Sequence, residues 1–231
     1  MTKPPALTFA HQQESVAGGG WIVTANGKPV KTVAGASLVL PEGDLAAAIA
    51  AEMQSQGQQS PLFRLASLLL DKYPAARSAD SAEVVSFIDT DLLCYRAHEP
   101  ADLVTWQSAH WEPHLAWAAA HGIRGLKTTH QATPLVQPTA AHQALEQHLA
   151  GLSDAALLVT VLATRLTGSA ILGLAFGLGV LDSQTAHAAA HADEFYQIER
   201  YAHDEEQAER LNLQLQHLEE LEQFRDFLRG D

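Results

Sequence analysis

Two histidines, His187 and His191, have a spacing that could serve a metal ion. Residues four apart lie on the same face of a helix, so both imidazoles could bind one ion. A zinc protease of the HExxH type needs a glutamate directly after the first histidine as general base, but residue 188 is alanine. A third ligand would have to come from His203, Asp193 or Glu194. Two alternatives stay open: a metal-dependent enzyme, or two polar, partly exposed histidines that bind no metal.

The sequence offers little other chemistry. It contains neither a GxGxxG motif nor a GK[ST] phosphate loop, and Gly168-Ser169 is not part of a GxSxG nucleophile elbow. Cys94, the single cysteine, lies among apolar neighbours, and we expect it to be buried and unreactive. We therefore expect no catalytic residue and no cofactor.

The carboxy-terminal segment from residue 193 to residue 231 is strongly acidic. It contains 12 acidic and four basic residues, so −8 of the formal net charge of −13 lies there. Phe195, Tyr196 and Tyr201 are interleaved with the first carboxylates. Such a surface could contact another protein through apolar area and attract it electrostatically. The alternative is a solvated first helical turn at Asp204, Glu205 and Glu206, where carboxylates favour the helix dipole.

Composition and charge exclude several classes of protein. A net charge of −13 argues against binding to nucleic-acid phosphates and against docking on an anionic membrane. A single cysteine and an amino terminus without the features of a secretory signal or transit peptide lead us to expect a cytoplasmic protein. Residues 166–181 form an uncharged run of 16, shorter than the roughly 20 that a membrane span needs. We expect a buried helix there, with Gly173 and Gly177 allowing close helix packing.

The elements that must position these residues are mostly helices. Asn26-Gly27 between residues 21–25 and 28–33 is typical of a type I′ β-hairpin, and residues 37–40 could be a further strand. We expect Asp44 and Ser183 to cap helices, and Pro113 to start, kink or break one. Apolar spacing predicts helices over residues 45–56, 61–73, 81–95, 99–121, 139–149, 154–179 and 184–228, the last with a break near Ala202.

Several segments, in order along the chain, resemble the Atp12 family, the assembly chaperones of the F1 sector of ATP synthase. They are NGKPVKT at residues 26–32, TDLLCYRA at 90–97, WEP at 111–113, LTGS at 166–169 and the acidic block DEFYQIERYAHDEE at 193–206. The chain departs from the family pattern at Met53, Tyr196 and Tyr201, where tryptophan is usual, and at Ala202, where glycine is usual. These departures preserve bulk and helicity, so we expect the fold to hold.

The resemblance implies an α+β protein with two domains. A small amino-terminal α+β domain would span residues 1–73, and a larger, mainly helical orthogonal bundle would span residues 74–231. It also implies a non-enzymatic bacterial chaperone that binds the free α subunit of F1-ATPase and prevents its aggregation until β arrives. We expect a monomer when free, with neither nucleic acid nor membrane insertion involved. The expected partner-binding residues are Asp193, Glu194, Tyr196, Glu199, Tyr201, Asp204, Glu205 and Glu206. A helical adaptor for another protein is the alternative.

Overall fold

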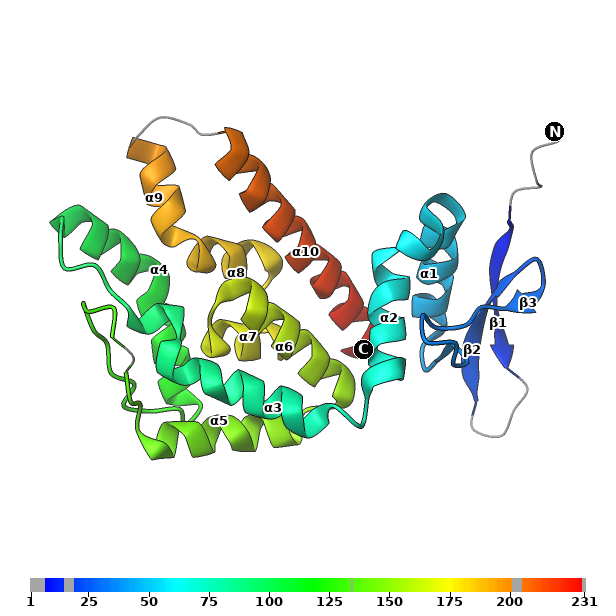
Figure 1. The fold of residues 1–231 in the computed structure, drawn as a ribbon, viewed down its shortest axis with the longest axis horizontal. Coiled ribbons are helices and arrows are strands. Elements are labelled where there is room, and N and C mark those ends of the chain that lie inside the picture. The colour runs from blue at the N-terminus through cyan, green and yellow to red at the C-terminus, as the bar shows by residue number, and fades with distance from the viewer. Residues whose placement is uncertain (1–6, 15–18, 134, 201–204, 230–231) are drawn as a thin grey trace. The chain divides into compact units, whose positions relative to one another are not determined.

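The structure is a computed structural model and describes residues 7–14, 19–133, 135–200 and 205–229 (Figure 1). The chain forms two compact units, one from Met1–Ala75 with Gln223–Asp231 and one from Ala76–Glu222. A four-stranded antiparallel sheet belongs to the first unit, and helices make up the rest of the fold. This arrangement confirms the α+β prediction. The division into domains at residues 73 and 74 stays a prediction.

The sheet of the first unit is built around β2 (Gly20–Ala25), which pairs with β1 (Phe9–Glu14), β3 (Lys28–Pro29) and β4 (Val39–Leu40). The predicted turn is confirmed, since Asn26 and Gly27 have φ angles of 49° and 76°. Glycine and asparagine tolerate this left-handed region, and a type I′ turn requires it twice. Strand β1 was missed because its residues 10–13 are exposed and show no apolar alternation.

Two α-helices, separated by the 3₁₀ turn η1 (Gly57–Gln59), follow the sheet in this unit. The first, α1 (Gly43–Gln56), begins after Glu42, so the prediction that Asp44 caps it was wrong; Asp44 lies within the first turn. The second, α2 (Pro61–Lys72), begins at proline as predicted. The Ser60 hydroxyl accepts a hydrogen bond from the Phe63 amide at 3.1 Å and thereby caps α2.

The second unit consists of short and long helices. They are α3 (Arg77–Ser86), the 3₁₀ turns η2 (Phe87–Thr90) and η3 (Leu92–Cys94), α4 (Ala101–Ala120), α5 (Thr139–Gly151), α6 (Asp154–Thr167), α7 (Ala170–Gly177), α8 (Ser183–Ala190), α9 (Ala192–Arg200) and α10 (Glu205–Arg229), whose residues from Gln223 on belong to the first unit. Pro113 lies inside α4 without ending it. Helix α4 continues past Pro113 while Trp111 and Ala118, on either side, stay buried.

The predicted helix over residues 81–95 is instead α3 followed by two 3₁₀ turns. The carboxylate of Asp91 is fully buried and caps η3, because it accepts hydrogen bonds from Leu93 N at 3.0 Å, Ser169 Oγ at 3.0 Å and Ile171 N at 3.2 Å. It therefore holds the start of η3 against the start of α7. Cys94 is buried as expected, and burial raises the pKa of its thiol to about 12.

The predicted helix over residues 154–179 is divided into α6 and α7. Gly168 adopts a left-handed φ of 67° and ends α6, and the Ser169 hydroxyl caps α7 by accepting from Leu172 N at 3.1 Å. Every residue of α7 is buried. Gly173 and Gly177 face Thr160 and Thr164 of α6 so closely that a side chain would meet them. The glycine pair thus packs two helices inside the protein. Among the described residues, none of the helices has both the length and the apolar character that a membrane crossing requires.

The predicted helix over residues 184–228 is divided into α8, α9 and α10. Asp182, not Ser183, caps α8, because its Oδ1 accepts from Thr185 N at 2.7 Å. A break at His191, which the sequence did not indicate, separates α8 from α9. The predicted break near Ala202 falls in residues 201–204, outside the described residues.

Candidate partner-binding surface

Helix α4 holds the start of α9 in place through two tryptophans and a glutamine. Trp111 Nε1 donates to Ala189 O at 2.8 Å, and Trp106 Nε1 donates to Ala192 O at 2.7 Å. Ala189 O lies in the last turn of α8, where carbonyls have no intrahelical partner, and Ala192 O lies at the start of α9. The Asp193 carboxylate accepts from Gln107 Nε2 at 2.8 Å, so Asp193 ties α9 to α4.

Tyr196 also faces inward. Its side chain is 4% exposed, and its ring meets Trp106 edge-on at a centroid distance of 6.2 Å. The guanidinium of Arg200 lies 4.7 Å from the Tyr196 ring centroid and 3.0 Å from the Asp102 carboxylate. A hydrogen bond with Tyr196 and then the charge of Arg200 lower the pKa of Asp102. This group therefore fixes the second half of α9 on α4.

Glu194 connects three helices. Its Oε1 lies 3.3 Å from His191 Nδ1 at the end of α8 and 3.6 Å from Arg210 NH2 on α10. The hydrogen bond with His191 is the main cause that lowers the pKa of Glu194. Glu194 is thus a carboxylate that joins α8, α9 and α10.

The remaining predicted contact residues that the structure describes point to solvent. Glu199 is exposed near the end of α9, and Glu205 and Glu206 are exposed at the start of α10. Tyr201 and Asp204 lie outside the described residues. The eight predicted residues therefore divide into three that hold the helices together (Asp193, Glu194 and Tyr196), three that face solvent, and two without a described position.

Leu213 was not anticipated as part of this surface. It lies on α10 with 52% of its side chain exposed, whereas Leu211, Leu218 and Leu221, part of an apolar seam at helical spacing along α10, are buried. Its position outside the three- and four-residue spacing of the seam was the available signal. Exposed Glu209 lies one helical turn before it. The outer face of α10 therefore combines carboxylates with one large apolar side chain.

His187 and His191 are buried, with exposures of 5% and 6%, so the expectation of partly exposed histidines was wrong. They are enclosed because α9 and α10 pack over the end of α8. Among the residues the structure describes, none of the groups of three or more histidine, cysteine or acidic side chains is arranged to hold a metal ion. His203, one of the possible third ligands, lies outside the described residues. The metal hypothesis gains no support from the described geometry.

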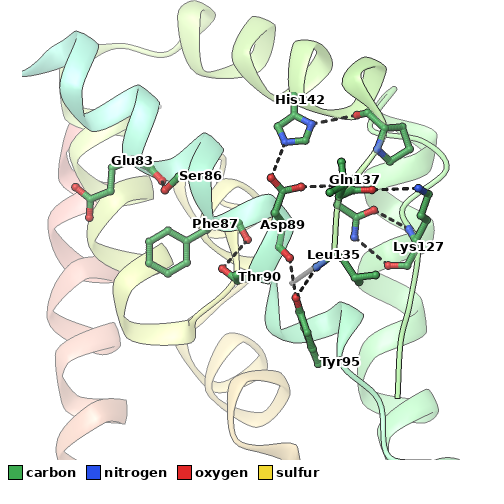
Figure 2. A network of polar contacts seen from close by, with 12 residues as sticks. Glu83, Ser86, Phe87, Asp89, Thr90, Tyr95, Lys127, Leu135, Gln137 and His142 are labelled. Carbon is green, nitrogen blue, oxygen red and sulfur yellow. Dashed lines mark hydrogen bonds and ion pairs between the residues drawn. The ribbon is translucent and has the colours of Figure 1, made fainter. Parts of the chain in front are cut away.

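A second polar cluster, the Asp89 network, shapes the segment between α4 and α5 (Figure 2). The Asp89 carboxylate accepts from Gln137 N at 2.8 Å and lies 3.2 Å from His142 Nε2. The Tyr95 hydroxyl donates to Asp89 O at 2.8 Å and accepts from Leu135 N at 3.1 Å. The side-chain amide of Gln137 then exchanges two hydrogen bonds with the Lys127 backbone, at 2.8 and 2.9 Å.

This network explains why a segment without helix or strand can be ordered. Buried or half-buried backbone groups need partners, and here side chains supply them together with one backbone bridge between Tyr95 and Thr129. Asp89, Gln137 and His142 were not singled out as functional, because single polar residues in a loop carry no recognisable spacing. Their observed role is to hold the segment in place.

The chain is similar to known chaperones over nearly its whole length. The ATP12 chaperone protein family matches residues 8–119. Atp12 from Paracoccus denitrificans is 33% identical, with 95% of each chain covered and a TM-score of 0.85, and a lysine-for-aspartate mutant of that protein is 32% identical with the same coverage and score. The Atu1473 protein of Agrobacterium tumefaciens is 32% identical, with 94% of this chain and 84% of that chain covered and a TM-score of 0.85. These similarities confirm the resemblance seen in the sequence: the chain belongs to the Atp12 family, a family of chaperones rather than of enzymes.

Proposed function

We propose that this chaperone binds the unassembled α subunit of F1-ATPase in the bacterial cytoplasm and prevents its aggregation until it meets β. The observation that carries this proposal is the similarity to Atp12 over 95% of both chains, together with the exposed carboxylates of α9 and α10. A subunit that awaits assembly exposes a large interface, and exposed apolar surface drives aggregation. A partner that covers the interface reversibly needs no catalytic group.

The contact surface we propose is centred on Glu199, Glu205 and Glu206. Carboxylates that face solvent attract a basic surface over a distance and raise the rate of encounter. Leu213 on the outer face of α10 adds apolar contact area. Asp193, Glu194 and Tyr196 then act indirectly, because their hydrogen bonds and ring contacts hold α9 against α4, α8 and α10. Tyr201 and Asp204, which lie outside the described residues, stay predicted contact residues.

Co-expression with the F1 α subunit of the same organism tests the function. The soluble fraction is separated by size exclusion and analysed by native mass spectrometry. We expect a one-to-one complex, with α insoluble when expressed alone. The proposal fails if α is equally soluble with and without the chaperone and no complex forms. Recovery of a stable complex with a different protein would instead support the adaptor.

Charge neutralisation tests the contact surface. The triple variant E199Q, E205Q, E206Q removes three exposed charges, and the triple variant E42Q, D44N, E146Q removes three exposed charges elsewhere. Exposed ion pairs contribute about 0.2–1 kcal/mol each, so the first variant should weaken α binding by about tenfold at low salt and less at high salt. Equal affinity of both variants at several salt concentrations would show that the surface lies elsewhere.

A further inference from the structure

The two buried histidines lie where α8, α9 and α10 meet. Their ring centroids are 4.8 Å apart, and His187 meets the Phe195 ring of α9 edge-on at 5.4 Å. His191 follows the last residue of α8, and His187 lies one turn earlier. The pair therefore fills the space between three helices.

Polar contacts from these two rings reach both neighbouring helices. His191 Nδ1 lies 3.3 Å from Glu194 Oε1 on α9, and that oxygen lies 3.6 Å from Arg210 on α10. The Leu211 backbone on α10 partly offsets the lowering of the His187 pKa. His191 thus links α8 to α10 through Glu194, and His187 lies beside the same helix. We call His187, His191, Glu194 and Arg210 the histidine junction.

Each ring also has a buried nitrogen atom whose proton would find no hydrogen-bond partner among the described residues. The Nε2 atoms of both His187 and His191 are buried, and neither has a hydrogen-bond partner among the described residues. A proton bound there would be a buried, unsatisfied donor that carries charge, which is costly. Burial is the main cause that lowers the pKa of His187, and the neighbouring His191 is the second.

The surrounding helices offer little charge to offset a second proton. Helix α7 has no titratable side chain, and the two charged residues of α6 pair with α3, Asp154 with Arg77 and Arg165 with Glu83.

On α4, Asp102 pairs with Arg200, Glu112 pairs with Arg96, and His110 and His114 add no negative charge. On α9, Asp193 is bound to Gln107. On α10, Glu206 and Glu209 are exposed. In the described part of the chain, Glu194 is the carboxylate in contact with the pair, and it is shared with Arg210.

We propose that the histidine junction is an acid-sensitive latch, in which neutral imidazoles keep α10 packed against α8 and α9 and a second proton on the pair releases it. Protons on both rings would place two like charges 4.8 Å apart, and Glu194, the carboxylate in contact with the pair, is shared with Arg210. The packing of α10 against α8 and α9 would then be lost. This inference does not depend on the identity of the client.

The direction of the pH dependence follows from the lowered pKa of His187. The folded protein binds fewer protons than the unfolded chain between the lowered pKa and the ordinary value of 6.5. The stabilising contribution is therefore present above about pH 6.5 and is lost as the pH falls below it. Each pKa unit of lowering corresponds to about a tenfold change in the opening equilibrium.

Hydrogen exchange of the full chain at pH 7.5 and pH 5.5, corrected for intrinsic rates, tests the latch. We expect the protection of residues 183–190 and 205–215 to fall by about tenfold or more in acid, while α5 changes little. In H187Q the fall should disappear, and in H191Q, which leaves the burial of His187 but removes the second charge, it should become smaller. H217Q is the matched control, because His217 is an exposed histidine on α10, the helix that the latch is proposed to release, and it should behave like the unmodified protein.

Two results would overturn the latch. The first is an unmodified protein whose α8 and α10 remain equally protected at both pH values. The second is an acid-dependent loss of protection that persists unchanged in H187Q and H191Q. Circular dichroism at pH 7.5 checks that each variant is folded, and either variant alone suffices for the comparison.

Discussion

The packing of α7 on α6 predicts a steep difference between two neighbouring glycines. A Cβ atom added at Gly173 would lie 2.8 Å from Thr164 N and 2.9 Å from Thr160 O. Carbon atoms in good contact lie about 3.5–4.0 Å apart, so G173A requires the two helix backbones to separate by more than half an ångström. Rotation of a side chain cannot relieve a contact with backbone atoms.

The magnitude follows from two opposing effects. Overpacking costs about 1–3 kcal/mol, and rigid backbone contacts on both sides place G173A at the upper end of that range. Replacing glycine by alanine in a helix gains about 1 kcal/mol. We expect G173A to lower the free energy of unfolding by about 2 kcal/mol.

Gly177 is less confined. A Cβ there would meet the Thr160 side chain, Ala156 O at 3.1 Å and Thr160 Cβ at 3.2 Å. Much of this contact can be relieved by movement of Thr160, so we expect G177A to cost less than about 1 kcal/mol. T160A should compensate for G177A but not for G173A. Gly151 at the end of α5 is the control, since a Cβ there meets nothing within 4 Å and G151A should be neutral or slightly stabilising.

Urea unfolding followed by tryptophan fluorescence measures these differences, because Trp106, Trp111 and Trp117 all lie on α4 in the same unit as α6 and α7. Equal m values would show that the variants change stability rather than the unfolding transition. The reasoning is refuted if G173A is as stable as the unmodified protein, or if G177A is the more damaging change.

Two further predictions concern buried polar groups. Burial raises the pKa of Asp91 from 3.8 to about 6, although hydrogen bonds from Ser169, Ile171 and Leu93 lower it. The stabilising contribution of Asp91 is therefore complete below about pH 3.8 and is lost as the pH rises through about 6. Relative to D91N, the unmodified protein should lose about 2–3 kcal/mol of unfolding free energy between pH 4 and pH 7. Urea unfolding measures this loss, and a constant difference between the two proteins across that range would contradict the prediction. In the Asp89 network, D89A should increase hydrogen exchange in residues 127–137 while leaving α6 and α7 protected, since it removes the acceptor of Gln137 N and the contact with His142. Unchanged exchange there would mean that the network does not hold the segment.

The features that the sequence predicted correctly depend on short-range rules. The Asn26-Gly27 turn requires two positive φ angles, and Pro61 begins a helix because its missing N–H has no partner to lose there. The apolar spacing of Leu211, Leu218 and Leu221 indicates one buried face of α10 without knowledge of what covers it. The ordered family motifs indicated the chaperone family for the same reason, since they can be read from residue order alone.

The orientation of the acidic segment was decided only by the tertiary structure. Asp193 and Glu194 are adjacent carboxylates in an acidic run, yet Asp193 accepts from Gln107, 86 residues earlier, and Glu194 lies between His191 and Arg210. Glu199, Glu205 and Glu206 are chemically equivalent to them in the sequence but face solvent. The partner that turns a carboxylate inward comes from another helix, and no local preference encodes its position. For the same reason the sequence could identify an acidic helical segment in a chaperone, whereas only the packing of α4, α8 and α10 around α9 decided which of its carboxylates are exposed.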